Sequence, residues 1–309
     1  MKVCFVGLGS IGKRHLLNLI KVCPSELHID ALRSGKQKLD LSIACYIEKE
    51  YYSIQNMDND YDVIFITNPT SYHGETVQRL CNKTKNFFIE KPIFNKYMKE
   101  INTMKFAPNV NYVACPLRHK EIMRYIKKQI IIKEKVISVR AVSSSYLPNW
   151  RKNQDYRKCY SSSQEMGGGV QRDLIHEWDY LVDLFGFPDK VEMMSAKLSD
   201  LEISSDDVTI YIAKYKDKFI ELHLDYFGHK TERKIELYCD GKTYIIDLIK
   251  NKIEEYKNNQ IQGEIIFDNG DFYEKEMKYF LCCIEGNIEN INPPEKANKI
   301  LALAMGDKS

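Results

Sequence analysis

The segment Lys2-Val3-Cys4-Phe5-Val6-Gly7-Leu8-Gly9-Ser10-Ile11-Gly12 decides the fold of the first half of the chain. The apolar run Lys2–Val6 predicts a short buried strand, and the apolar spacing after Ser10 predicts a helix. The GxGxxG pattern between them is typical of a dinucleotide-binding turn. Its glycines let the backbone approach a pyrophosphate, and the helix amino terminus offers N–H groups to it. We therefore expect cofactor contacts from Gly7, Gly9, Ser10, Ile11 and Gly12. A glycine-rich turn of some other α/β protein is the alternative.

The choice of dinucleotide depends on the residues after the next strand, which we expect at His28–Leu32. An NAD-binding turn expects an acidic residue there, to bind the ribose 2′-hydroxyl. This chain has Arg33, followed by Ser34 and Lys36, and an arginine suits a 2′-phosphate. We therefore predict NADP(H) rather than NAD(H). In the alternative, Arg33 is a solvated surface residue and Asp30 or a later group binds the ribose.

Two further apolar runs, Tyr61–Thr67 and Asn86–Ile89, predict more strands of a doubly wound parallel sheet. Such sheets bind their ligands at the carboxyl ends of the strands. The residues that follow these strands are therefore candidate cofactor contacts: Asn68, Pro69, Thr70, His73, Glu90 and Lys91.

The composition argues against several other classes of protein. The 309 residues carry a formal net charge of +2 with no long basic block, so neither nucleic acid nor an anionic membrane is an expected partner. Nine scattered cysteines lack zinc spacing, and we expect no metal. Without a signal peptide or an apolar run of about 18 residues, a cytoplasmic protein with reduced thiols is expected.

Four motifs in order resemble the Gfo/Idh/MocA family of sugar and cyclitol oxidoreductases. They are GLGSIG with Lys13-Arg14-His15, TNPTSYH at 67–73, EKP at 90–92, and GGGVQRDLIHEWDYLVDLFG at 167–186. The HEWDYL variant resembles a branch associated with surface-sugar biosynthesis.

The resemblance implies an α/β chain with an amino-terminal Rossmann domain at 1–117. A carboxy-terminal α+β domain with an open, mostly antiparallel sheet follows at 118–309. It implies hydride transfer between a nicotinamide and a sugar carbon, with Lys91 beside the reacting hydroxyl and a Lys91–Pro92 peptide bond that is often cis. It also implies a homodimer or homotetramer formed through the sheet, and a small sugar substrate, possibly nucleotide-linked.

A helix predicted over Val170–Phe185 carries the candidate acid/base. Its apolar stripe leaves Asp173, His176 and Tyr180 on another face. Oxidising an alcohol requires a group that accepts the hydroxyl proton, and a histidine titrates near neutrality. The resemblance assigns this role to His176, with Asp173 as its partner. A surface histidine in a modest ion pair with Asp173 is the alternative.

This helix departs from the family pattern, which places Asp and His four residues apart. Here Asp173 and His176 are three apart, and Arg172 stands at the four-apart position. His176 and Asp179 keep the family's HxxD spacing, so the assignment depends on His176 and leaves the role of Asp173 open. Glu177 replaces Asp173 only if the helix is rotated.

The second domain supplies the candidate substrate residues. The resemblance points to Arg118, and the loop after a strand at 136–145 holds aromatic and charged side chains suited to sugars or phosphates. The candidates are Arg118, Trp150, Tyr156, Arg157 and His176. A helix-start arginine in solvent and a loop whose aromatic rings only cover the domain edge are the alternatives.

The sequence favours an NAD(P)-dependent sugar dehydrogenase or reductase. One alternative is a non-catalytic NADP- or sugar-sensing protein, which binds the dinucleotide without turnover. Another is an epimerase or eliminase that keeps its cofactor through an internal redox cycle.

Overall fold

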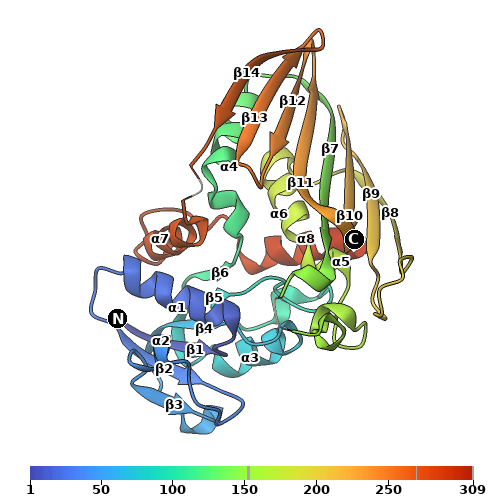
Figure 1. Cartoon of the computed structure of the whole chain (residues 1–309). Helices are drawn as coiled ribbons and strands as arrows, with labels where there is room; N and C mark the ends of the chain where they lie inside the picture. The colour runs from blue at the N-terminus through green and yellow to red at the C-terminus, as the bar shows by residue number, and fades with distance from the viewer. Residues whose placement is uncertain (152–153, 269, 308–309) are drawn as a thin grey trace. The chain divides into compact units, whose positions relative to one another are not determined.

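The computed structural model describes residues 1–151, 154–268 and 270–307, which form two compact units (Figure 1). The first unit is Met1–Pro116 together with Asp271–Leu301, and the second is Leu117–Gly270 with the residues from Ala302 onward. The division after Pro116 lies one residue from the expected boundary at 117/118. All of 118–309 was expected in one domain, but residues 271–301 pack with the first unit instead.

The first unit contains, within the described residues, a six-stranded sheet in the order β3-β2-β1-β4-β5-β6, and every neighbouring pair is parallel. Its strands are β1 Lys2–Val6, β2 His28–Leu32, β3 Lys49–Tyr51, β4 Tyr61–Ile66, β5 Thr84–Ile89 and β6 Asn111–Val113. Its helices are α1 Ser10–Val22, α2 Leu41–Ala44, α3 His73–Leu80, α7 Phe272–Ile284 and the first part of α8 Pro294–Met305. The predicted Rossmann sheet is thus confirmed.

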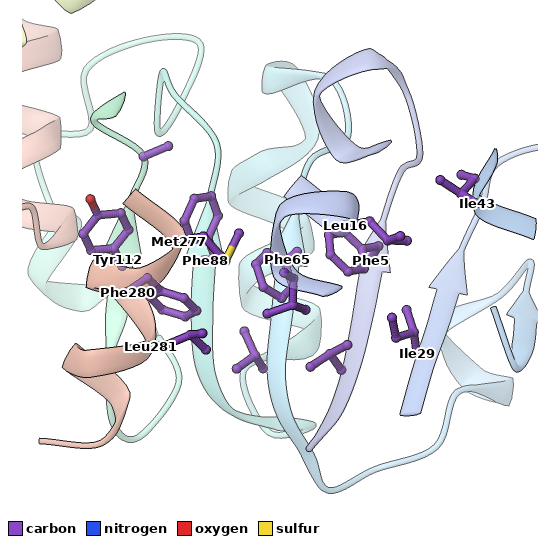
Figure 2. Packing of buried hydrophobic residues seen from close by; sticks show 14 of the residues in the cluster. Phe5, Leu16, Ile29, Ile43, Phe65, Phe88, Tyr112, Met277, Phe280 and Leu281 are labelled. Carbon is purple, nitrogen blue, oxygen red and sulfur yellow. The ribbon is translucent and has the colours of Figure 1, made fainter. Parts of the chain in front are cut away.

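The core of this unit explains why α7 belongs to it. Figure 2 shows Met277, Phe280 and Leu281 of α7 packed with aromatic side chains of the sheet. The Phe280 ring centroid lies 5.2 Å from that of Phe88 in β5 and 5.7 Å from that of Tyr112 in β6. Since α1 lies beside α7 (Figure 1), the two helices together cover this part of the sheet.

The second unit contains, in the part of the chain that the structure describes, an eight-stranded sheet in the order β14-β13-β12-β11-β7-β10-β9-β8 (Figure 1). The β10–β7 pair is parallel and the others are antiparallel, which confirms the mostly antiparallel sheet. The strands are β7 Val136–Tyr146, β8 Lys190–Ala196, β9 Val208–Lys214, β10 Phe219–Asp225, β11 Phe227–Cys239, β12 Lys242–Asp247, β13 Lys252–Lys257 and β14 Gln260–Ile266. The hairpin of β13 and β14 was not predicted.

In the described part of this unit, helices pack against one face of the sheet. They are α4 Glu121–Tyr125, which continues as a π-helical segment Ile126–Ile131, then α5 Val170–Asp173 and α6 His176–Phe185. Trp178 of α6 packs edge-on against Tyr211 of β9, with ring centroids 5.3 Å apart. On the other face, large apolar side chains stay exposed, including Met194, Ile210, Ile212 and Phe219. No helix among the described residues is long and apolar enough to cross a bilayer.

We predict that Phe280→Ala destabilises the protein by about 3–5 kcal/mol, because it removes a fully buried ring from the core of the first unit. Urea unfolding followed by circular dichroism measures the change. Phe187→Ala is the matched control, since that ring is 42% exposed and its loss should shift stability by less than about 0.5 kcal/mol. Equal effects of the two substitutions would contradict the assignment of α7 to this core.

Candidate dinucleotide and substrate sites

The glycine loop after β1 is packed too tightly for side chains at two positions. Gly7 has a φ of +88°, and a Cβ on Gly12 would lie 2.4 Å from the Gly7 carbonyl oxygen. The Thr67 hydroxyl at the end of β4 donates to the same oxygen at 2.5 Å. Thr67 was not among the predicted site residues, although it opens the TNPTSYH motif. Its hydroxyl fixes the Gly7 carbonyl oxygen on the side of the loop that faces β4.

The amino terminus of α1 has the properties of an anion site. Gly9 is the capping residue, no side chain caps the helix, and no acidic residue lies in the first turn. A Cβ on Gly9 would meet nothing within 4 Å, so the space above the loop is open. The first-turn N–H groups and the helix dipole therefore fit the pyrophosphate of a dinucleotide.

Arg33 follows β2 as predicted, but its guanidinium already has partners. It donates to the Glu50 carboxylate of β3 and to the Gln37 carbonyl oxygen, and its side chain is only 12% exposed. The hydrogen bond from Arg33 lowers the pKa of Glu50, so this carboxylate is ionised at neutral pH. Ser34 and Lys36 are exposed beside this pair. A carboxylate next to the expected position of a 2′-phosphate was not foreseen from the sequence.

The loop after β4 holds its polar side chains inward. Asn68 donates from Nδ2 to the Thr76 hydroxyl of α3 at 2.9 Å, whereas Pro69 is exposed and Thr70 is half-buried. His73 is 1% exposed, with Nε2 2.9 Å from the Asn68 carbonyl oxygen and Nδ1 3.1 Å from that of Pro92. Burial lowers the pKa of His73. Its neutral ring therefore lies between two loops of the sheet edge and donates one hydrogen bond there. We had expected His73 to contact a cofactor instead.

The EKP segment lies at the end of β5, the neighbour of β4. The Glu90 carboxylate contacts the buried His15 of α1, with Oε1 2.5 Å from Nε2, while Oε2 accepts the Lys91 N–H at 3.0 Å. Glu90 was predicted as a cofactor contact, and the structure uses its carboxylate inside the protein. Lys91 is half-buried, and the Lys91–Pro92 peptide bond is cis, as the resemblance implied.

In the second unit, the predicted helix over 170–185 is two helices. The chain leaves α-helical geometry at Leu174, and α6 begins at His176, which is half-buried. The predicted common face is therefore wrong. Asp173 is 5% exposed and accepts a hydrogen bond of 2.5 Å from the Tyr226 hydroxyl, and Tyr160 bonds to the same carboxylate.

Tyr180 and Glu177 also point into the unit. Both are fully buried, and the Glu177 carboxylate lies 2.9 Å from Nε of Arg233 in β11. Burial, with the neighbouring Glu177 charge, raises the pKa of Tyr180 well above its ordinary value. Tyr180 therefore stays a neutral phenol at physiological pH, and Glu177 is bound to the sheet.

Arg118 is likewise a buried residue. Its side chain is 1% exposed, and it holds both oxygens of Asp179 in α6, with Nε 2.8 Å from Oδ2 and Nη2 2.6 Å from Oδ1. The Asp of the HxxD spacing is thus the partner that fixes Arg118. This geometry supports neither the predicted substrate contact nor the alternative of a helix-start arginine in solvent.

The predicted substrate loop forms a pocket within the second unit. It is lined by Leu147, Pro148, Trp150, Arg151, Gln154, Tyr156, Cys159 and Ser161. The Trp150 ring packs edge-on against Tyr226, with ring centroids 5.2 Å apart. The pocket therefore adjoins the Tyr226 side chain that bonds to Asp173. Arg157 is instead bound on the surface to Asp155 and Glu202, at 2.8 and 3.0 Å. Trp150 and Tyr156 therefore stay candidates, and Arg151 joins them.

A family model described as an oxidoreductase family with an NAD-binding Rossmann fold, Gfo/Idh/MocA, matches residues 1–109. Over these residues the chain is similar to the Gfo/Idh/MocA family. The glycine loop, Arg33 and the EKP segment all lie within the matched residues.

Known relatives share the fold more clearly than the sequence. The scyllo-inositol 2-dehydrogenase (NAD(+)) of Bacillus subtilis (strain 168) is 28% identical over 98 residues, which are 30% of this chain and 28% of that protein. The UDP-N-acetylglucosamine 3-dehydrogenase GnnA from Acidithiobacillus ferrooxidans matches with a TM-score of 0.75 and 15% identity, over 100% of this chain and 96% of that one. The WlbA dehydrogenase from Bordetella pertussis, solved with NADH and UDP-GlcNAcA, has a TM-score of 0.77 and 16% identity, over 99% and 94%. At these identities the two solved structures establish the two-domain fold alone.

We predict that Asp173→Asn costs about 1–3 kcal/mol of stability, because a buried carboxylate that accepts the Tyr226 hydroxyl is replaced by a weaker acceptor. Urea unfolding of Asp173→Asn, Tyr226→Phe and the double variant measures their coupling. We expect the double variant to lose less than the sum of the two single changes. Asp155→Asn, on an exposed pair, is the control. Additive losses would show that the two side chains do not act together.

Proposed function

We propose that the protein is an NAD(P)-dependent oxidoreductase acting on a sugar hydroxyl or ketone, with a nucleotide-linked sugar as the favoured substrate class. The observation that carries the proposal is the edge of the Rossmann sheet. There, the glycine loop and the uncapped helix α1 follow β1, the EKP segment follows β5, and both strands pair with β4. The activities that name the relatives, on scyllo-inositol and on UDP-N-acetylglucosamine, support the substrate class.

The bound nicotinamide supplies or accepts the hydride, and the protein supplies position and proton transfer. The α1 amino terminus holds the pyrophosphate. Lys91 donates a hydrogen bond to the reacting oxygen and stabilises the negative charge that develops on it. His176 accepts the hydroxyl proton during oxidation and returns it during reduction. Trp150, Arg151 and Tyr156 bind the sugar or its phosphate. Arg118 holds α6, which carries His176, and Asp173 holds the preceding helix α5.

NADP(H) remains our proposed cofactor, with Glu50 as the residue that modulates the choice. The Arg33 guanidinium is suited to a 2′-phosphate, but the Glu50 carboxylate on the same guanidinium repels that phosphate. We also propose that the exposed apolar face of β8, β9 and β10 pairs two copies of the chain, since that face leaves large side chains in solvent.

We expect Lys91→Met and His176→Asn each to lower kcat by about 10²–10⁴-fold while the dinucleotide Kd changes by less than about threefold. The assay follows nicotinamide absorbance with scyllo-inositol, UDP-N-acetylglucosamine and UDP-GlcNAcA, each with NAD and NADP. His223→Asn, a histidine of β10, is the control. Dinucleotide binding without turnover of these substrates would favour the sensor, and turnover without net nicotinamide change would favour the internal redox cycle.

Glu50→Gln should tighten NADP binding by about three- to tenfold and leave NAD binding within about twofold, because it removes the charge that opposes the 2′-phosphate. Calorimetry with both dinucleotides measures the ratio. Glu48→Gln changes an exposed carboxylate that pairs with His28 and serves as the control. An unchanged NADP/NAD ratio in Glu50→Gln, together with an unchanged ratio in Arg33→Asp, would remove Arg33 from the cofactor site.

A further inference from the structure

His15 and Glu90 form a buried contact between two ionisable side chains of the first unit. His15 is 0% exposed and Glu90 is 5% exposed, and Glu90 Oε1 lies 2.5 Å from His15 Nε2. The other carboxylate oxygen accepts the backbone N–H of Lys91 at 3.0 Å. One carboxylate thus connects the His15 ring to the backbone of the proposed catalytic lysine.

The protonation of the pair follows from its surroundings. Burial raises the pKa of Glu90, but the hydrogen bond and charge of His15, together with Lys91, outweigh it and leave the pKa lowered. Glu90 is therefore a carboxylate, and His15 Nε2 carries the hydrogen that it accepts. A buried carboxylate oxygen that has lost its donor is disfavoured, so loss of His15 should weaken the hold on Glu90 and leave it only the Lys91 N–H.

A second buried histidine holds the segment on the other side of Lys91. His73, the first residue of α3, places Nδ1 3.1 Å from the Pro92 carbonyl oxygen and 3.2 Å from that of Ile93. Its Nε2 lies 2.9 Å from the Asn68 carbonyl oxygen. The backbone on both sides of Lys91 is therefore fixed by imidazole rings from different helices.

His15 also belongs to the helix that begins at the glycine loop. It lies in the second turn of α1, whose amino terminus starts at Ser10, and its ring packs on Phe88 with centroids 4.7 Å apart. A helix is rigid over this length, so the proposed pyrophosphate site and the Glu90 carboxylate are joined by one helix and one side chain.

We propose that His15 is a positioning residue that, through Glu90, holds the Lys91 backbone in fixed register with the dinucleotide-binding helix α1. The proposal rests on the proposed function only for the role of Lys91 in turnover. The contact itself is independent of that role. No sequence motif for this contact was recognised, although His15 stands in the first of the four matching motifs.

The test compares His15→Leu with His15→Gln and with His28→Leu as a matched control. His28 forms an exposed pair with Glu48 in the same unit, with Nδ1 2.9 Å from Oε1, so the same substitution removes a His–Glu contact far less buried. Glutamine keeps an N–H donor near the position of Nε2 and cannot become cationic.

We expect His15→Leu to speed amide hydrogen exchange in the peptide 84–94, measured by mass spectrometry, by at least about tenfold over wild type. We expect kcat to fall by about 10–100-fold, because a small displacement of a reacting group is costly, with substrate KM and dinucleotide Kd within about threefold. His15→Gln should recover exchange and kcat to within about fivefold of wild type, and His28→Leu should match wild type. Near-UV circular dichroism establishes that each variant is folded.

Glu90→Gln covers the case in which His15→Leu does not fold. Its amide preserves the shape but has one acceptor oxygen for the two donors, so exchange at 84–94 should rise in this variant too. Exchange at the His28→Leu level in every folded variant would overturn the proposal, as would faster exchange with unchanged kcat. A wild type without turnover would defeat the proposed function, whereas the exchange result would still decide whether His15 holds the segment.

Discussion

The close approach of α1 to the glycine loop is the constraint on which the first unit depends. Gly12 lies against the Gly7 carbonyl oxygen at a distance that excludes a Cβ, and the Thr67 hydroxyl holds the same oxygen. This contact fixes where α1 begins and how it runs across the sheet. Because no side chain caps the helix, its first backbone N–H groups are available to a ligand at the carboxyl end of β1. Because the helix is rigid, the position of its amino terminus also places His15 against Glu90.

Much of the fold was predictable because the relevant signals are local. The bounds of β1 and β2 agree with the predicted ranges, since each is a strongly patterned segment between clear breakers. The β13–β14 hairpin was missed, although the Asn258-Asn259 pair in its turn is a signal in the sequence. Both residues have positive φ in the structure, as a two-residue hairpin turn requires. The return of α7 to the first unit had no local signal, because it depends on packing between segments far apart in the chain.

The candidate site was predictable in its residue types and only partly in their partners. The sequence placed Arg33, Asn68 and Glu90 after the right strands, because parallel strands collect their carboxyl ends at one edge. It did not reveal that the Arg33 guanidinium binds the Glu50 carboxylate, or that the Arg118 guanidinium binds the Asp179 carboxylate. Such pairs depend on register between strands and helices, and a charge alone does not identify which opposite charge it meets.

The spacing of Asp173 and His176 illustrates how a one-residue change alters chemistry without altering the fold. A shift of one position turns a helical side chain by about 100°. Here the chain also interrupts the helix between the two residues, so α6 can keep Asp179 on Arg118 while Asp173 belongs to a separate turn. Its carboxylate then anchors α5 to the sheet through Tyr226, next to the pocket that Trp150 lines. Asp173 therefore acts on the pocket only through Tyr226, whose ring packs against Trp150. In the first unit, by contrast, two buried imidazoles lie against the segment that holds Lys91, one through Glu90 and one directly at Pro92.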